Sequence, residues 1–196
     1  MTTDIAAIHQ FWFGPLDAAG LASPAQERLW FNGGAEFDAA VAARFGALVP
    51  RALAGELDHW AGDDRGLIAL VLLLDQFTRN ILRGTPGAFA GDGKALAAAQ
   101  AAIADGRHLA LPAIHRVFLY LPLEHSEDLA VQEQSVRLFT ELAGSSGAEA
   151  TGGFARYAAA HRDVIARFGR FPHRNAILGR TSSPEELAHM EAHGGF

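Results

Sequence analysis

An apolar run of eight residues, Leu67 to Leu74, is the longest in the sequence and sets the strongest constraint on its fold. It is well short of the roughly 18 residues that a membrane-spanning helix needs, so we expect no membrane span. A helix that is apolar on every side has to be covered by other elements all round. The run therefore predicts a central buried helix, which carries the polar residues that follow it toward the interior.

Helix is favoured over strand along the whole chain. Alanine occurs 39 times, against 22 for valine, isoleucine and threonine together. Ser23-Pro24 with Gln26, and Ser183-Pro184 with Glu186, have the spacing of helix capping boxes. Pro122 and the loop 144–147 are expected to interrupt helices. The predicted helices cover residues 4–12, 24–32, 36–60 with a kink or break at Pro50, 64–82, 92–105, 112–120, 127–143, 154–168 and 184–192.

Length and composition narrow the class of protein. A chain of 196 residues without a composition shift or a long linker predicts one all-α domain, 1–196, with neighbouring helices antiparallel. The absence of cysteine excludes disulfides, a thiol nucleophile and a Cys-ligated zinc site. No secretory signal is evident, so we expect a cytoplasmic protein. A net charge of −6 argues against nucleic-acid binding, and we expect neither a nucleic-acid nor a membrane partner.

The positive charges are unevenly distributed. Fifteen of the 16 cations are arginine, and six of them lie between residues 156 and 180, where Asp163 is the only acid. That segment carries a net charge of +5, which leaves −11 for the rest. Within it, residues 168–175 alternate arginine with aromatic residues, glycine and proline, a pattern that can hold guanidinium groups for a carboxylate or a phosphate. Alternatively, Arg170 and Arg174 clamp helices together by binding carbonyls or acids such as Asp75 and Glu127.

Further polar residues occur where a core is expected. Asp75 and Arg79 follow the apolar run with i, i+4 spacing and can pair, either to present Arg79 to an anion or as a structural ion pair. His161 lies on the apolar stripe of its predicted helix and should point inward, as should Gln132. A lone inward histidine can equally be a hydrogen-bonded core residue.

The segment 125–127 offers an imidazole and a carboxylate just before a predicted helix, whose amino terminus favours anions. In the alternative interpretation, Ser126 or Glu127 only caps that helix.

Together these residues predict one polar pocket for a small anionic ligand. Histidine titrates near neutral pH, so His125 and His161 are the candidate acid and base, and hydrolysis of a phosphorylated or acylated metabolite would suit such a site. A metal site built from histidines and Glu127 is an alternative, but the spacings match no standard signature; we assign no metal and no cofactor. The predicted ligand-binding residues are Asp75, Arg79, Asn80, Glu127, Arg170, His173, Arg174 and Asn175.

Several motifs, in order along the chain, resemble those of the bacterial family of unknown function numbered nine hundred and twenty-four. The resemblance implies an all-helical protein with a tetratricopeptide-like, right-handed superhelix. It assigns no catalytic role, because the family has no established activity. The motifs are Trp12-Phe13-Gly14, Trp30-Phe31, Leu74-Asp75-Gln76-Phe77-x-Arg79-Asn80, Phe118-x-Tyr120-Leu121-Pro122-x-x-His125-Ser126-Glu127, His161, and Phe168 to Asn175 with Gly179-Arg180.

Two other functions fit the same residues. Helical superhelices present concave grooves, and an arginine-lined groove can hold an acidic or carboxy-terminal peptide. The polar residues can also serve the fold alone.

Overall fold

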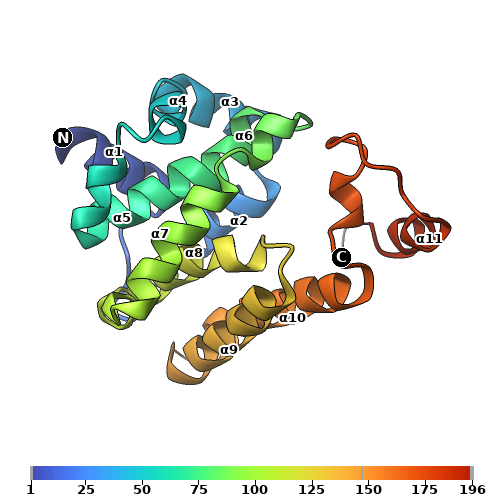
Figure 1. Cartoon of the computed structure of the whole chain (residues 1–196). Helices are drawn as coiled ribbons and strands as arrows, with labels where there is room; N and C mark the ends of the chain where they lie inside the picture. The colour runs from blue at the N-terminus through green and yellow to red at the C-terminus, as the bar shows by residue number, and fades with distance from the viewer. Residues whose placement is uncertain (1, 147, 195–196) are drawn as a thin grey trace. The chain divides into compact units, whose positions relative to one another are not determined.

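The computed structural model describes residues 2–146 and 148–194, without the side chains of residues 2, 31 and 148–150. Phe31, one of the motif residues above, therefore has its side chain outside the described part. Over the described residues the chain is helical and contains no strand, which confirms the all-α prediction (Figure 1). The chain divides into two compact units. The first takes the chain up to Arg83 and Gly87–Pro122, and the second takes Gly84–Pro86 and the chain from Leu123 onward.

The first unit is built around the predicted central helix. Residues 67–74 are all buried, and the helices α1, α4 and α7 pack on this stretch. Its second half, η2, is a π-helix, which then continues into α6. The elements up to η2 are α1 (Thr2–Trp12), α2 (Pro24–Asn32), α3 (Gly34–Phe45), α4 (Leu48–Leu53), η1 (Asp58–Gly62), α5 (Asp64–Val71) and η2 (Leu72–Phe77). They are followed by α6 (Thr78–Ile81), η3 (Pro86–Phe89), α7 (Asp92–Ala104), η4 (Arg107–Ala110) and α8 (Ala113–Glu124).

Aromatic side chains fill the core of this unit. The Trp12 ring lies 5.3 Å from that of Phe77 and 5.6 Å from that of Phe118, measured between centroids. Trp12 and Phe13 are each 1% exposed, so both lie in this core. α1 is thereby anchored to the central helix and to α8.

Two helix boundaries predicted near prolines are wrong. The helix expected over 36–60 ends at Phe45 and resumes as α4, which contains Pro50 in its first turn, where a missing N–H costs no helical hydrogen bond. The helix expected over 112–120 runs on through Pro122 to Glu124. Proline cannot donate the backbone bond of a helix interior, but near the end of α8 only this one bond is lost. Glu124 therefore lies on a helix and not in a loop.

The second unit consists of the end of α8, α9 (Leu129–Ser146), α10 (Ala148–Phe168), η5 (Pro172–Arg174) and α11 (Pro184–His193). α9 and α10 lie side by side (Figure 1). They are antiparallel, because Phe139 stacks on Phe154 while Ser146 bonds Thr151 near the connection. α9 runs through most of the loop expected at 144–147, of which Gly147 lies outside the described residues.

The two predicted capping boxes differ in outcome. The Ser183 box at the start of α11 is confirmed, since Ser183 and Glu186 each bond the other's backbone N–H. At α2, Ser23 caps the helix through Gln26 N, but the Gln26 side chain donates to Phe11 O instead. None of the helices in the described ranges is long and apolar enough to cross a membrane.

Candidate functional site

His161 is the centre of the strongest candidate site, which lies in the second unit. It projects from α10, is 6% exposed, and so points inward as its place on the apolar stripe predicts. Its Nδ1 atom lies 2.8 Å from the Tyr157 carbonyl oxygen one turn earlier. The same atom lies 3.3 Å from a carboxylate oxygen of Glu124, at the end of α8.

The contacts of Nδ1 fix the protonation pattern of this imidazole. A carbonyl oxygen only accepts hydrogen bonds, so Nδ1 carries the proton and the lone pair of the neutral ring lies on Nε2. Burial lowers the pKa of His161 to about 3, and the nearby charges of His125, His173 and Arg174 act in the same direction. His161 is therefore neutral at pH 7, with Nε2 as a proton acceptor.

The polar side chains of the site pack against the Phe171 ring. It is fully buried, and His161 meets it edge-on with the ring centroids 5.6 Å apart. The His173 ring lies at the same centroid distance, and the Arg174 guanidinium lies over the Phe171 face, 4.5 Å from its centroid. The His125 ring lies 6.3 Å from that of His161. We call Glu124, His125, His161, Phe171, His173 and Arg174 the histidine cluster.

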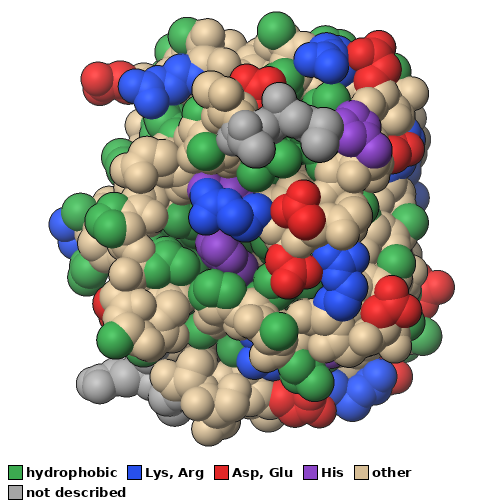
Figure 2. All heavy atoms as spheres, turned by 90° about the vertical axis from the view of Figure 1, so that its left-hand side faces the viewer, with side chains coloured by type: hydrophobic (Ala, Val, Ile, Leu, Met, Phe, Trp, Pro, Cys, Tyr) green, Lys and Arg blue, Asp and Glu red, His purple; other side chains and the backbone are tan. Residues whose placement is uncertain are grey.

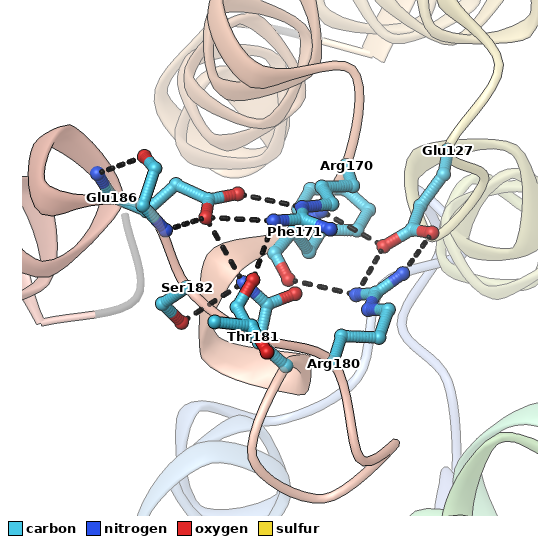
Figure 3. Close-up of polar contacts among 9 residues, drawn as sticks. Glu127, Arg170, Phe171, Arg180, Thr181, Ser182 and Glu186 are labelled. Atoms are coloured by element: carbon cyan, nitrogen blue, oxygen red, sulfur yellow. Dashed lines mark hydrogen bonds and ion pairs between the residues drawn. The ribbon is translucent and has the colours of Figure 1, made fainter.

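Glu127 supports this cluster and does not cap α9. Its carboxylate accepts two hydrogen bonds from Arg180 and one from the backbone N–H of Phe171, as Figure 3 shows. The Arg180 and Phe171 bonds hold the pKa of Glu127 below its usual value against the opposing effect of burial. The residue that caps α9 is Asp128, whose side chain accepts from Ala130 N and Val131 N. The alternative interpretation, in which Ser126 or Glu127 only caps this helix, is therefore wrong.

Arg170 and Asn175 bind Glu186. Arg170 donates to both carboxylate oxygens, at 2.6 and 2.8 Å (Figure 3). Asn175 donates to Ser182 and more weakly to Glu186. These bonds lower the pKa of Glu186 to about 2, and the bond from Arg170 has the largest effect. For Arg170 the structure supports the clamp alternative, with Glu186 as the acid.

The other predicted ligand residues belong to the first unit. Arg79 lies 3.2 Å from Asp75, which confirms their pairing, and it also binds both carboxylate oxygens of Asp92. Asp75 is fully buried, so this pair sits inside the unit as expected. Asn80 donates to Asp38 at 2.7 Å. All three predicted side chains thus have structural partners within the first unit.

The first unit also contains a buried histidine pair that the sequence analysis did not single out. His9 donates through Nε2 to the Arg65 carbonyl oxygen, and its ring meets that of His115 edge-on at 5.0 Å. Burial lowers the pKa of both, that of His115 to about 3. On the face drawn in Figure 2, histidine side chains lie directly above and below a Lys or Arg side chain, among hydrophobic ones.

Sequence reasoning also missed the role of two acids. A helix that ends before Pro122 leaves Glu124 in a loop and gives it no role, although its position next to His125 is an available signal. Glu186 was interpreted only as a capping residue, although it also binds Arg170. The metal alternative finds no support within residues 2–146 and 148–194, where no three His, Asp or Glu side chains are grouped to hold an ion.

The fold and the histidine cluster define an all-α protein with polar side chains buried between helices. Residues 8–194 match the family model described as "Bacterial protein of unknown function (DUF924)", and the chain belongs to this family. A solved structure of a protein of unknown function from Agrobacterium tumefaciens, ATU0120, is 38% identical, with a TM-score of 0.84. The alignment covers 97% of this chain and 98% of that one. No curated protein matches.

Proposed function

We propose that the histidine cluster binds a small anionic ligand and that His161 acts there as the base of a hydrolytic reaction. The observation that carries the proposal is the buried His161 imidazole, whose Nδ1 faces both the Tyr157 carbonyl and the Glu124 carboxylate. An imidazole oriented by a carboxylate, with its other nitrogen as proton acceptor, is the arrangement of a general base.

Arg174 provides the positive charge for the anion. It is 7% exposed and lies over the Phe171 ring, so its charge acts in surroundings of low polarity, where attraction to an anion is strong. His125 and His173 are half-buried beside it, and an imidazole donates an N–H bond in either protonation state. The proposed anion site therefore has one fixed cation and two adaptable donors. Arg170, which binds Glu186, is left out of it.

The proposed reaction is attack by water on an anionic ester or acyl compound. The water oxygen forms a bond to the phosphorus or acyl carbon, and the water proton passes to His161 Nε2. The bond to the leaving oxygen breaks, and His125 donates a proton to that oxygen. Burial is the main cause of the low pKa of His161, and the nearby positive charges add to it; an anion bound beside Arg174 offsets these charges and so raises the basicity of His161.

A second candidate function is a tetratricopeptide-like module that binds an acidic or carboxy-terminal peptide. The antiparallel pairing of α9 and α10 favours it, because paired helices are the repeating unit of such right-handed superhelices. In this case the peptide carboxylate takes the place of the small anion at Arg174. In both cases we propose that the protein works in the cytoplasm.

The proposal is tested with inorganic phosphate as the binding probe and with acetyl phosphate and p-nitrophenyl phosphate as substrates. We expect phosphate to raise the melting temperature of the full chain, because a ligand that binds only the folded state stabilises it. His161→Asn keeps an amide N–H near the position of Nδ1 but removes the base. It should retain phosphate binding and lose about 100-fold or more in turnover.

The matched control is His193→Asn, which changes an exposed histidine of α11. It should leave binding and turnover unchanged. Arg174→Met should abolish the phosphate effect. Binding without turnover in the wild type, together with binding of an acidic carboxy-terminal peptide, would favour the peptide module. If neither phosphate nor the peptide binds, the cluster serves the fold alone.

A further inference from the structure

We infer that Gln132 is a positioning residue that sets where Glu124 and His125 lie relative to His161. This inference rests on the function proposed above, because it concerns the same site. Gln132 projects from α9 and is fully buried, as its inward position in the sequence predicts. Its action is on the short segment that joins α8 to α9.

Gln132 binds both ends of the turn that carries His125. Its Nε2 atom donates to the carbonyl oxygens of Glu124 and Ser126, each at 2.6 Å. Two short bonds from one buried amide fix its orientation, since Nε2 is the only part of the side chain that can donate. The backbone on both sides of His125 is therefore held by one side chain.

Arg174 completes the arrangement. Its Nη2 atom donates to the carbonyl oxygen of His125 at 2.9 Å. Three successive carbonyl groups, those of residues 124, 125 and 126, thus each accept a hydrogen bond from a side chain of α9 or η5. The backbone that carries the Glu124 and His125 side chains therefore cannot move relative to His161 without breaking one of these bonds.

This role is distinct from ordinary core packing. The Gln132 Oε1 atom is buried, and within the described residues it has no hydrogen-bond partner. A buried acceptor without a partner costs roughly 1–3 kcal/mol, so an apolar side chain of the same size would suit packing at least as well. The glutamine is instead explained by its two donated bonds, and hence by the geometry that they impose on the turn.

The test compares Gln132→Met, which keeps the size but removes the donor, with Ser135→Ala. Ser135 lies one turn along the same buried face of α9, and within the described residues its hydroxyl has no hydrogen-bond partner. The histidine ring signals of both variants and of the wild type are followed by NMR through a pH titration of the full chain without ligand. Circular dichroism checks that each variant is folded.

In the wild type, protonation of His125 should move the ring signals of His161, because the two rings are 6.3 Å apart. In Gln132→Met this response should fall to about half or less, and phosphate affinity should fall about tenfold, while Ser135→Ala matches the wild type in both. Gln132→Asn, whose amide is too short to reach both carbonyls, replaces the methionine variant if the latter does not fold.

An unchanged His161 response in a folded Gln132 variant would overturn the inference, as would an equal loss in Ser135→Ala. The ring titration needs no ligand. If the wild type shows the response and Gln132→Met loses it, but phosphate does not bind, then the proposed function fails while the positioning role stands.

Discussion

Arg180 binds Glu127 through both terminal nitrogens of its guanidinium group, at 2.8 and 2.9 Å from the two carboxylate oxygens. One of these nitrogens also donates to the carbonyl oxygen of Phe171, whose N–H donates to Glu127. The ion pair therefore closes around the backbone of Phe171 (Figure 3). His161 and Arg174 pack on the ring of this residue. It ties the segment just before α9 to the segment that follows α10.

Removing the charge of Glu127 should loosen this connection. We expect Glu127→Gln to lower the free energy of unfolding by about 1–3 kcal/mol, since hydrogen bonds to a charged group contribute in that range. Urea denaturation at pH 7 measures the loss. Glu133→Gln, an exposed substitution on α9, is the control and should change stability by less than about 0.5 kcal/mol. Equal stability of both variants would contradict the role of the pair.

Glu186 should make stability depend on pH in acid. Its folded pKa of about 2 lies below the ordinary value of 4.5, so its contribution is complete above pH 4.5 and is lost as the pH falls toward 2. The difference in unfolding free energy between the wild type and Glu186→Gln should therefore shrink steadily across this range. Urea titrations at successive pH values measure it. A difference that does not change between pH 5 and 2.5 would contradict the assignment.

The central helix and α7 approach closely at Gly91. A Cβ atom at this position would lie 2.1 Å from the carbonyl oxygen of Leu74 in the π-helix, and a backbone atom cannot move away without separating the two elements. Gly91→Ala should therefore cost about 2–4 kcal/mol. Gly93→Ala, two residues further along, meets no atom within 4 Å and should be neutral or stabilising by up to about 1 kcal/mol. Thermal melts should therefore give a lower melting temperature for Gly91→Ala than for Gly93→Ala.

The His9–His115 pair should weaken the first unit as the pH falls. Both folded-state pKa values lie below the ordinary 6.5, so the unfolded chain takes up protons first and stability declines from about pH 6.5 toward pH 3. His115→Leu should make the unfolding free energy less dependent on pH in this window. His59→Leu changes an exposed histidine and should leave the wild-type pH dependence in place. An unchanged pH dependence in His115→Leu, or a reduced one in His59→Leu, would contradict the assignment of this pH dependence to the His9–His115 pair.

Local sequence patterns were sufficient for much of the fold. The apolar run 67–74 predicted the central helix, and the stripe through His161 predicted its inward position. Both depend only on helical periodicity. The helix end predicted before Pro122 is wrong. Proline weakens a helix locally, but the last residues of α8 are buried and the helix continues to Glu124.

The partners of the arginines could not be predicted in the same way. Arg170 binds Glu186 and Arg180 binds Glu127, and in each case the residues come from different elements. Only Asp75 and Arg79, which are neighbours on one helical stretch, could be paired from spacing. Composition located the positive segment, but the fold decides which of its charges are bound by acids.

The most direct test of the histidine site is a titration of the isotopically labelled full chain with inorganic phosphate, followed through the histidine ring signals. We predict saturable shifts for His125, His161 and His173 together, with His161 in the Nδ1–H form before phosphate is added and with its pKa raised after. Shifts confined to exposed histidines such as His59 and His193, or His161 in the Nε2–H form, would contradict the proposed site.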